Sequence, residues 1–341
     1  MKRSRIATIA LAVALLGLVV GLVACGEKSE DVAPVAEPLS LTLDFYPNPD
    51  HAGIFLAQKR GYFEEAGLDV TIHTPADPAA PIKLLAAGKT DLAISYEPEV
   101  LLARDQGLDV VAVAALVNTP LTSMIWLKKS GIQGVADLRG KTIATAGIPY
   151  QDAYLKTILA RAKLAPSDVK AVNVGYGLLP AIVGGRAQAM LGGFRNVEGV
   201  DLRVRGKDPV VTPVDRLGVP TYDELVIAAR GDRLKDDPEP IRLFLAALER
   251  GAVAAAAEPE PTATKALLEA NPDLDPRLTS AEVAATQPLL DPPRNGRPYG
   301  YMSPAAWRRF AGWMRDNDLV ASLIQPSEAL SDAYLPGAIA E

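Results

Sequence analysis

The segment from residue 39 to residue 69 limits the possible folds most, because two strand patterns and one helix pattern follow each other there without a long loop. It begins with apolar side chains at every second position, as in a half-buried strand: Leu39, Leu41, Leu43 and Phe45. Pro47 ends this strand, and the Asn48 side chain can accept a hydrogen bond from the first free amides of a helix. The helix is expected over residues 52–66 and a second strand over residues 68–72, an order that predicts an α/β sheet.

The turn after this first strand carries candidate ligand contacts. Phe45, Tyr46 and Asn48 lie there, at the carboxyl end of the predicted sheet, where open α/β sheets bind their ligands. Aromatic rings can stack on a planar heterocycle, and a few polar groups can fix its orientation. The turns after three later predicted strands add further candidates: Ser95 and Tyr96, then Tyr176, then Phe194, Arg195 and Glu198.

Apolar strands and helices continue to alternate after this unit. The run from residue 109 to residue 117 is apolar after its first residue, which predicts a strand buried inside a parallel sheet with helices on both faces. From residue 240 the chain is rich in Ala and predicts helices that fold back on the first part of the chain: 241–257, 262–270, 281–289 and 304–316. We expect two α/β lobes around a ligand cleft, with lobe 1 at 40–122 plus 226–341, lobe 2 at 123–225, and hinge crossings near 120–128 and 221–228.

The composition excludes several functions. The formal net charge is −6 and no dense basic tract occurs, so a nucleic-acid partner is not expected. The chain has one Cys and two His, which excludes a zinc site built from several Cys and His residues and an internal disulfide. It contains no dinucleotide-binding glycine pattern, no Walker loop and no nucleophilic triad. We therefore expect no cofactor.

The single cysteine, Cys25, follows a segment that is typical of a secretory signal. Basic residues precede an apolar run over residues 6–24, and the run ends in Leu-Val-Ala-Cys, which resembles a bacterial lipobox. This pattern predicts a signal peptide over residues 1–24, a lipid attached to Cys25, and a polar tether over residues 25–39. A plain signal or an N-terminal membrane anchor is the alternative. The expected location is extracytoplasmic, at the membrane.

Two motifs carry a family resemblance. The run DFYPNPDHAGIFLAQKRGYFEEAGLDV, residues 44–70, and the run GGFRNVEGV, residues 192–200, resemble the pyrimidine-precursor-binding proteins of thiamine salvage. That group is part of a broad family of periplasmic binding proteins that includes sulfonate and nitrate binders. The resemblance implies a type II periplasmic-binding-protein fold and a monomer that captures a formylaminopyrimidine or hydroxymethylpyrimidine. It also implies an ABC permease and its ATPase as partners.

The resemblance implies roles for three residues, and two departures leave the ligand open. It places a carboxylate at Glu198, an aromatic ring at Phe194 and an asparagine at Asn48 against the ligand. Phe45 stands where the family often has Trp, and Arg195 replaces another aromatic residue. Arg195 can pair with Glu198, or it can bind an anionic ligand such as an alkanesulfonate.

An enzyme is the alternative from a different class. The related eukaryotic pyrimidine synthases share the opening motif, but their cofactor-binding lysine aligns near Ser95 and their reactive histidine near Glu99. Their Cys-rich cluster has no counterpart here. The sequence therefore predicts a binding protein rather than an enzyme, and a sensor or adhesion lipoprotein with the same fold is a third alternative.

Overall fold

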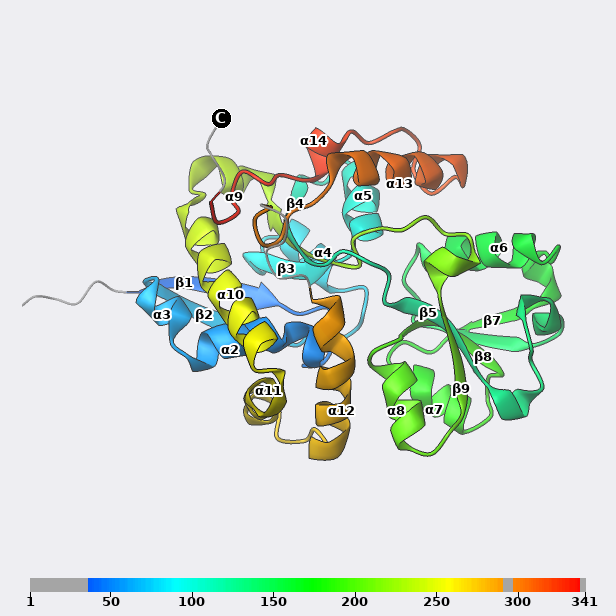
Figure 1. Cartoon of the computed structure of the whole chain (residues 1–341). Helices are drawn as coiled ribbons and strands as arrows, with labels where there is room; N and C mark the ends of the chain where they lie inside the picture. Colours follow the sequence, from blue (N-terminus) through cyan, green and yellow to red (C-terminus); the bar gives the residue numbers. More distant parts are fainter. Residues whose placement is uncertain (1–35, 291–296, 338–341) are drawn as a thin grey trace, which may run out of the picture. The chain divides into compact units, whose positions relative to one another are not determined.

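The structure is a computed structural model that describes residues 36–290 and 297–337. The predicted signal peptide and Cys25 lie outside these residues. The described chain contains two five-stranded sheets, each covered by helices (Figure 1). We call the elements on the first sheet lobe 1 and the elements on the second sheet lobe 2.

The first sheet has the order β2-β1-β3-β10-β4. Its strands are β1 (Glu37–Thr42), β2 (Leu68–His73), β3 (Leu92–Ser95), β4 (Val110–Val117) and β10 (Leu225–Arg230). β1 runs parallel to β2 and β3, whereas β10 runs antiparallel to β3 and β4. β1 begins at Glu37, so the predicted tether is wrong for residues 37–39, which form part of the sheet.

The second sheet has the order β7-β6-β8-β5-β9. Its strands are β5 (Thr122–Leu127), β6 (Thr142–Thr145), β7 (Lys170–Asn173), β8 (Ala189–Phe194) and β9 (Pro209–Pro213). β6 is parallel to β7 and β8, while β5 is antiparallel to β8 and β9. The expected purely parallel sheet is therefore wrong for both sheets. Each sheet is mixed because the strand next to a crossing, β5 or β10, runs against its neighbours.

The first crossing between the sheets is shorter than predicted, and the second is longer. The chain leaves the first sheet after Val117 and enters the second at Thr122; it returns between Pro213 and Leu225. Residues 122–127 lie within the extended crossing expected near 120–128, and they form β5, the first strand of the second sheet along the chain. The second crossing, expected near residues 221–228, ends at Leu225, where β10 begins. Tyr222 and Glu224 lie just before this strand, and the Tyr222 hydroxyl donates to Glu224 Oε2 at 3.0 Å.

Helices cover both sheets. Those before the second crossing are the 3₁₀ turn η1 (Pro49–His51), α2 (Ala52–Lys59), α3 (Tyr62–Glu65), α4 (Pro81–Ala86), α5 (Glu97–Asp105), α6 (Gln151–Arg161), α7 (Leu178–Val183) and α8 (Glu198–Val204). The helix predicted over residues 52–66 is two helices, because Gly61 adopts a left-handed conformation with φ +71°. β9 and α8 were not predicted.

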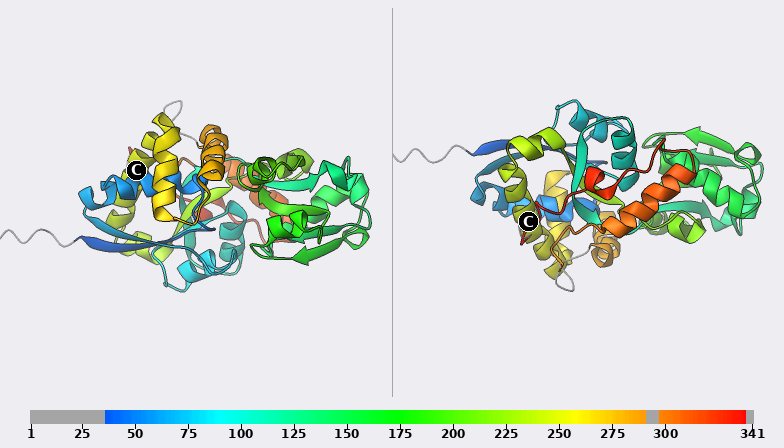
Figure 2. Two further views of the ribbon diagram at one scale, coloured as in Figure 1. Left: turned by 90° about the horizontal axis from the view of Figure 1, so that it is seen from below. Right: turned by 90° about the horizontal axis from the view of Figure 1, so that it is seen from above.

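The C-terminal helices fold mainly on lobe 1, as expected. They are α9 (Gly231–Asp236), α10 (Glu239–Ala257), α11 (Thr264–Ala270), α12 (Pro276–Thr286), α13 (Pro304–Asp316) and α14 (Pro326–Ala329). α10 crosses α2 so closely that a Cβ atom on Gly251 would lie 2.1 Å from the carbonyl oxygen of Gly53 (Figure 1). α13 also reaches lobe 2, where Trp313 contacts Tyr154 of α6 at a ring-centroid distance of 5.7 Å (Figure 2). Within residues 36–290 and 297–337, no helix has the length and apolar content needed to span a bilayer.

Candidate functional site

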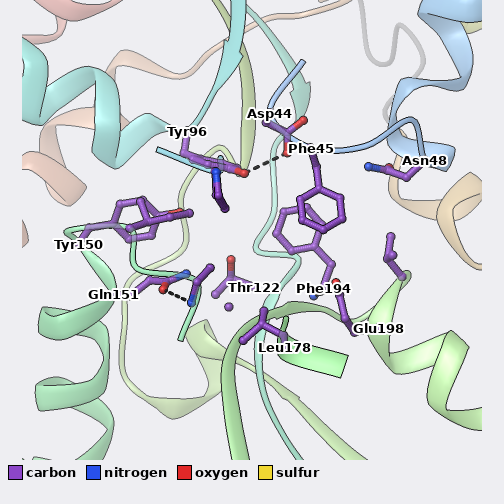
Figure 3. Close-up of a pocket in the computed structure, with 15 residues that line it drawn as sticks. Asp44, Phe45, Asn48, Tyr96, Thr122, Tyr150, Gln151, Leu178, Phe194 and Glu198 are labelled. Atoms are coloured by element: carbon purple, nitrogen blue, oxygen red, sulfur yellow. Dashed lines mark hydrogen bonds between the residues drawn. The ribbon is translucent and has the colours of Figure 1, made fainter. Parts of the chain in front are cut away.

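A pocket lies between the two lobes, at the ends of strands from both sheets (Figure 3). Lobe 1 contributes the turn after β1, the loop after β2 and the residue after β3: Asp44, Phe45, Asn48, Pro78 and Tyr96. Lobe 2 contributes Thr122, Ala146, Ile148, Tyr150, Gln151, Leu178, Gly192, Phe194, Val197 and Glu198. The pocket therefore lies at the carboxyl ends of strands from both sheets, the place where open α/β sheets bind their ligands.

Two carboxyl groups line the pocket from opposite lobes. Glu198 is the first residue of α8, and its Oε2 accepts a hydrogen bond from the Phe194 amide at 2.7 Å. Burial raises the pKa of Glu198 to about 7, so its carboxyl group can either donate or accept near neutral pH. Asp44, on the lobe 1 side, was not among the predicted site residues. None of the described lining residues is Lys or Arg, so the pocket favours a ligand with donor groups or positive charge.

Aromatic rings form the walls of the pocket and its edge. Phe45 and Phe194 line it from opposite lobes, as Figure 3 shows. Tyr96 also lines it and contacts Tyr150 with ring centroids 6.0 Å apart. Tyr176 of lobe 2 packs edge-on against Phe45, with centroids 4.7 Å apart, and lies outside the set of lining residues.

Two of the predicted contact residues, Tyr46 and Ser95, lie beside or behind the pocket rather than in its lining. The Tyr46 side chain is half exposed and packs against Phe45 and Tyr176 beside the pocket. Ser95 is fully buried, and its hydroxyl donates to Glu99 Oε2 at 2.8 Å. Neither residue lines the pocket in this structure.

Asn48 lines the pocket, and its amide also builds the turn that follows β1. Its Oδ1 accepts from the Asp50 amide at 2.9 Å, and its Nδ2 donates to the Tyr46 carbonyl at 3.0 Å. The cap confirms the predicted helix start, while contact between Asn48 and a ligand stays a prediction. One hydrogen of Nδ2 remains for a ligand after these bonds are made.

Arg195 does not line the pocket. Its Nη2 lies 3.3 Å from the hydroxyl of Thr119 in the first crossing, so its head group points toward the crossing. The expected pairing partner, Glu198, instead accepts its hydrogen bond from a backbone amide. A ligand anion in the pocket would therefore meet two carboxyl groups before it met this guanidinium group.

Several pocket residues were missed although the same rule would have found them. Tyr150 and Gln151 follow β6, just as Phe45 follows β1, and they begin α6. Gln151 Oε1 accepts from the Ala146 amide at 3.0 Å, which holds the side chain beside Gly192 (Figure 3). Asp44 directly precedes Phe45, and a polar side chain at the end of an apolar strand was the available signal.

A family model and several relatives match the chain. The family described as NMT1/THI5 like matches residues 48–262. The formylaminopyrimidine-binding protein of Halalkalibacterium halodurans is 32% identical over 321 residues, which cover 94% of this chain and 97% of that protein. A Haemophilus influenzae protein whose name refers to thiamine biosynthesis is 41% identical over 214 residues, 63% of this chain and 68% of that protein.

The chain is also similar to proteins that are named as enzymes and to solved structures with this fold. A 4-amino-5-hydroxymethyl-2-methylpyrimidine phosphate synthase of Saccharomyces cerevisiae is 29% identical over 254 residues, 71% of this chain and 74% of the synthase. The alkanesulfonate-binding protein of Xanthomonas axonopodis has a TM-score of 0.67 at 18% identity, covering 86% of this chain and 98% of that one. The likeness to that structure establishes the periplasmic-binding-protein fold. The family model covers more than half of the sequence, and the chain belongs to the NMT1/THI5-like family.

Proposed function

We propose that this protein is the extracytoplasmic solute-binding component of an ABC importer and that it captures a thiamine pyrimidine precursor of the formylaminopyrimidine or hydroxymethylpyrimidine type. The observation that carries the proposal is the pocket between the lobes, which has a carboxyl group on each side, aromatic walls and no basic residue among its described lining. The identity to a formylaminopyrimidine-binding protein along most of the chain supports the same ligand class.

The chemistry of an aminopyrimidine suits this lining. Its flat ring can stack between Phe45 and Phe194, which face the pocket from opposite lobes. Its amino group donates hydrogen bonds, and the ring nitrogen beside that group accepts one. A carboxyl group with a pKa of about 7, such as Glu198, can serve both atoms, because its protonated form donates to the ring nitrogen while its other oxygen accepts from the amino group.

Capture would work by closure of the lobes. A ligand that contacts side chains on both sides of the pocket stabilises the conformation in which the lobes are closest, and the permease then recognises that conformation. We further propose a lipid on Cys25 as the membrane anchor, residues 1–24 as the signal peptide, and a monomer as the functional unit. The residues preceding the described part of lobe 1 would form the tether.

We favour a binding role over the catalytic role that the names of the synthase relatives describe. At the positions that align near the lysine and histidine of the eukaryotic synthases, this chain has Ser95 and Glu99. These two side chains hydrogen-bond to each other at 2.8 Å, and neither lines the pocket. They offer no amine for a cofactor and no imidazole for the reaction.

Calorimetric titration tests the proposal. The protein is titrated, in the mature form that the cell produces, with formylaminopyrimidine, hydroxymethylpyrimidine, thiamine and methanesulfonate. We expect a pyrimidine to bind with a dissociation constant of about 1 μM or tighter, close to −8 kcal/mol. Glu198→Gln should weaken this binding, whereas Arg195→Ala should leave it unchanged. Binding of methanesulfonate alone, lost in Arg195→Ala, would replace the proposed ligand with an anion.

A further inference from the structure

Asp44 is held by two donors on the lobe 1 side of the pocket. His51 Nε2 lies 2.8 Å from Asp44 Oδ1, and the Tyr96 hydroxyl donates to Asp44 Oδ2 at 2.9 Å. All three side chains are buried, with exposed fractions of 1% for Asp44, 0% for His51 and 4% for Tyr96. The three residues come from the turn after β1, the turn η1 and the end of β3, so separate parts of lobe 1 hold one carboxylate.

The backbone determines which nitrogen of His51 carries the proton. The amide of Asn48 points at His51 Nδ1 at 3.3 Å, and an amide can only donate. Nδ1 is therefore the acceptor, and the hydrogen of the neutral ring lies on Nε2, where it is donated to Asp44. Burial raises the pKa of Tyr96 well above its ordinary value, so its hydroxyl also keeps its proton.

Asp44 still has acceptor capacity toward the pocket. A carboxylate offers about four lone-pair sites, and the two donors use one on each oxygen. Asp44 lines the pocket, unlike His51, which lies behind it. An acceptor-only carboxylate without a basic partner is costly to bury unless further donors reach it. Because Asp44 lines the pocket, a donor group on a bound ligand can supply a further hydrogen bond.

We propose that Asp44 is a ligand anchor that accepts a hydrogen bond from an amino or ammonium nitrogen, and that His51 and Tyr96 are positioning residues that aim its carboxylate. This inference rests on the proposed function and adds a second anchor, on the lobe opposite Glu198. It assigns the pocket a ligand with hydrogen-bond donors at two separated points, one facing each lobe, with a nitrogen donor at Asp44. Phosphorylated or sulfonated ligands are disfavoured at this anchor.

Matched substitutions separate positioning from a purely structural role. Gln at position 51 places an amide nitrogen near the site of Nε2, so His51→Gln keeps the donor to Asp44. Asn places an oxygen near the site of Nδ1, so His51→Asn keeps the acceptor for the Asn48 amide and loses the donor to Asp44. We expect His51→Gln to bind the pyrimidine within about threefold of wild type and His51→Asn to bind about tenfold more weakly.

Two further variants complete the series. Asp44→Asn should weaken pyrimidine binding by about 100-fold, and Tyr96→Phe by about tenfold, since each removes a bond to a charged group. Asp91→Asn is the control, because Asp91 accepts hydrogen bonds from Ser40 in lobe 1 and does not line the pocket. Equal losses in His51→Gln and His51→Asn, or wild-type affinity in Asp44→Asn, would overturn the proposal.

Nitrogen NMR tests the positioning without any ligand. The sequence contains two histidines, so a protein labelled with ¹⁵N-histidine gives signals from His51 and His73 alone, and His73→Gln identifies those of His51. We expect a protonated Nε2 and an unprotonated Nδ1 at neutral pH. The opposite tautomer or a doubly protonated ring would overturn the proposal. If no pyrimidine binds the wild-type protein, the proposed function fails, and this measurement still decides the geometry at Asp44.

Discussion

Asn196 Nδ2 donates to Asp50 Oδ1 at 2.8 Å, and this hydrogen bond joins the turn after β8 in lobe 2 to the turn η1 in lobe 1. The same Nδ2 donates to the hydroxyl of Thr286 on α12, also at 2.8 Å. Both residues of the Asn196–Asp50 pair are buried, beside the pocket residues Val197 and Asn48. One amide group therefore holds two lobe 1 elements against lobe 2.

This contact predicts that Asn196 stabilises the lobe arrangement. Asn196→Ala removes both bonds and should raise the free energy of that arrangement by about 1–3 kcal/mol. We expect weaker pyrimidine binding and a larger radius of gyration of the ligand-free protein in small-angle X-ray scattering. Thr286→Val removes only one bond and should give roughly half the loss of affinity. An unchanged radius and affinity in Asn196→Ala would contradict the role.

Carboxyl groups at the same contact predict a pH dependence. Burial, together with the nearby Glu198, Asp201 and Asp50, raises the pKa of Glu282 on α12 to about 9. Asp201 is also paired with Arg205, which directly follows α8, and Arg203 is a second basic residue in the last turn of that helix. Because the folded-state pKa of Glu282 lies above its unfolded value, its stabilising contribution is complete below about pH 4.5 and is lost as the pH rises toward 9.

Thermal unfolding across this pH range checks the effect. We expect the melting temperature of the wild type to fall between pH 5 and pH 9 by more than that of Glu282→Gln. The Gln side chain resembles protonated Glu282 and stays uncharged at every pH. The two proteins should melt alike near pH 4.5. Glu328→Gln, an exposed change within α14, is the control and should follow the wild-type curve. Parallel curves for wild type and Glu282→Gln would refute the assignment.

Glu224 joins the two crossings and predicts a large effect on stability. Its Oε2 accepts from the amides of Leu121 and Thr122 at 2.7 and 2.8 Å and from the Tyr222 hydroxyl at 3.0 Å. Glu224→Ala leaves these buried donors without an acceptor and should lower the free energy of unfolding by about 3–5 kcal/mol. Glu224→Gln keeps an acceptor oxygen and should cost about 1 kcal/mol. Urea unfolding measures the free energy of unfolding of both variants. Equal losses in Glu224→Ala and Glu224→Gln would rule out the proposed role of Glu224 as the acceptor that joins the crossings.

Gly192 predicts a local effect on the pocket. It has φ +112°, and a Cβ atom there would lie 2.5 Å from Gln151 Nε2, so Gly192→Ala both strains the backbone and displaces a pocket side chain. We expect about a tenfold loss of pyrimidine affinity in addition to a loss of stability of about 1–2 kcal/mol. Gly206→Ala is the matched control: φ is +68° and no atom lies within 4 Å. It should lose stability alone, so a similar loss of affinity in both variants would disprove the steric argument.

The sequence predicted the elements that depend on local patterns. α13 has the bounds that its apolar spacing predicted, and the Asn48 cap begins η1 as expected. β9 escaped notice because its residues, Pro209–Pro213, include a proline at each end and gain their strand conformation from pairing with β5. The helix break at Gly61 was missed because the apolar pattern continues through it.

The sequence predicts the location of the candidate site better than it predicts which side chains line it. The strand-end rule selected Phe45, Tyr96 and Phe194, which line the pocket, but it also selected Tyr46 and Ser95, which do not. Whether a side chain at a strand end faces the pocket depends on its hydrogen-bond partner, which for Ser95 is the buried Glu99 four residues later. The hydrogen bond from Tyr96 to Asp44, like that from Asn196 to Asp50, joins segments far apart in the sequence and leaves no trace in local spacing.

The position of β10 in the first sheet has a consequence for the order of folding. All strands of lobe 2 come from residues 122–213, whereas β3 and β4 of lobe 1 receive their common neighbour only when residues 225–230 are available. As the chain is synthesised from its N-terminus, lobe 2 can complete its strand ladder first, and lobe 1 keeps two unpaired strand edges until β10 inserts. The half of the pocket that carries Asp44 and Tyr96 is therefore the last to form, and a chain truncated before residue 225 would have a complete second sheet and no binding site.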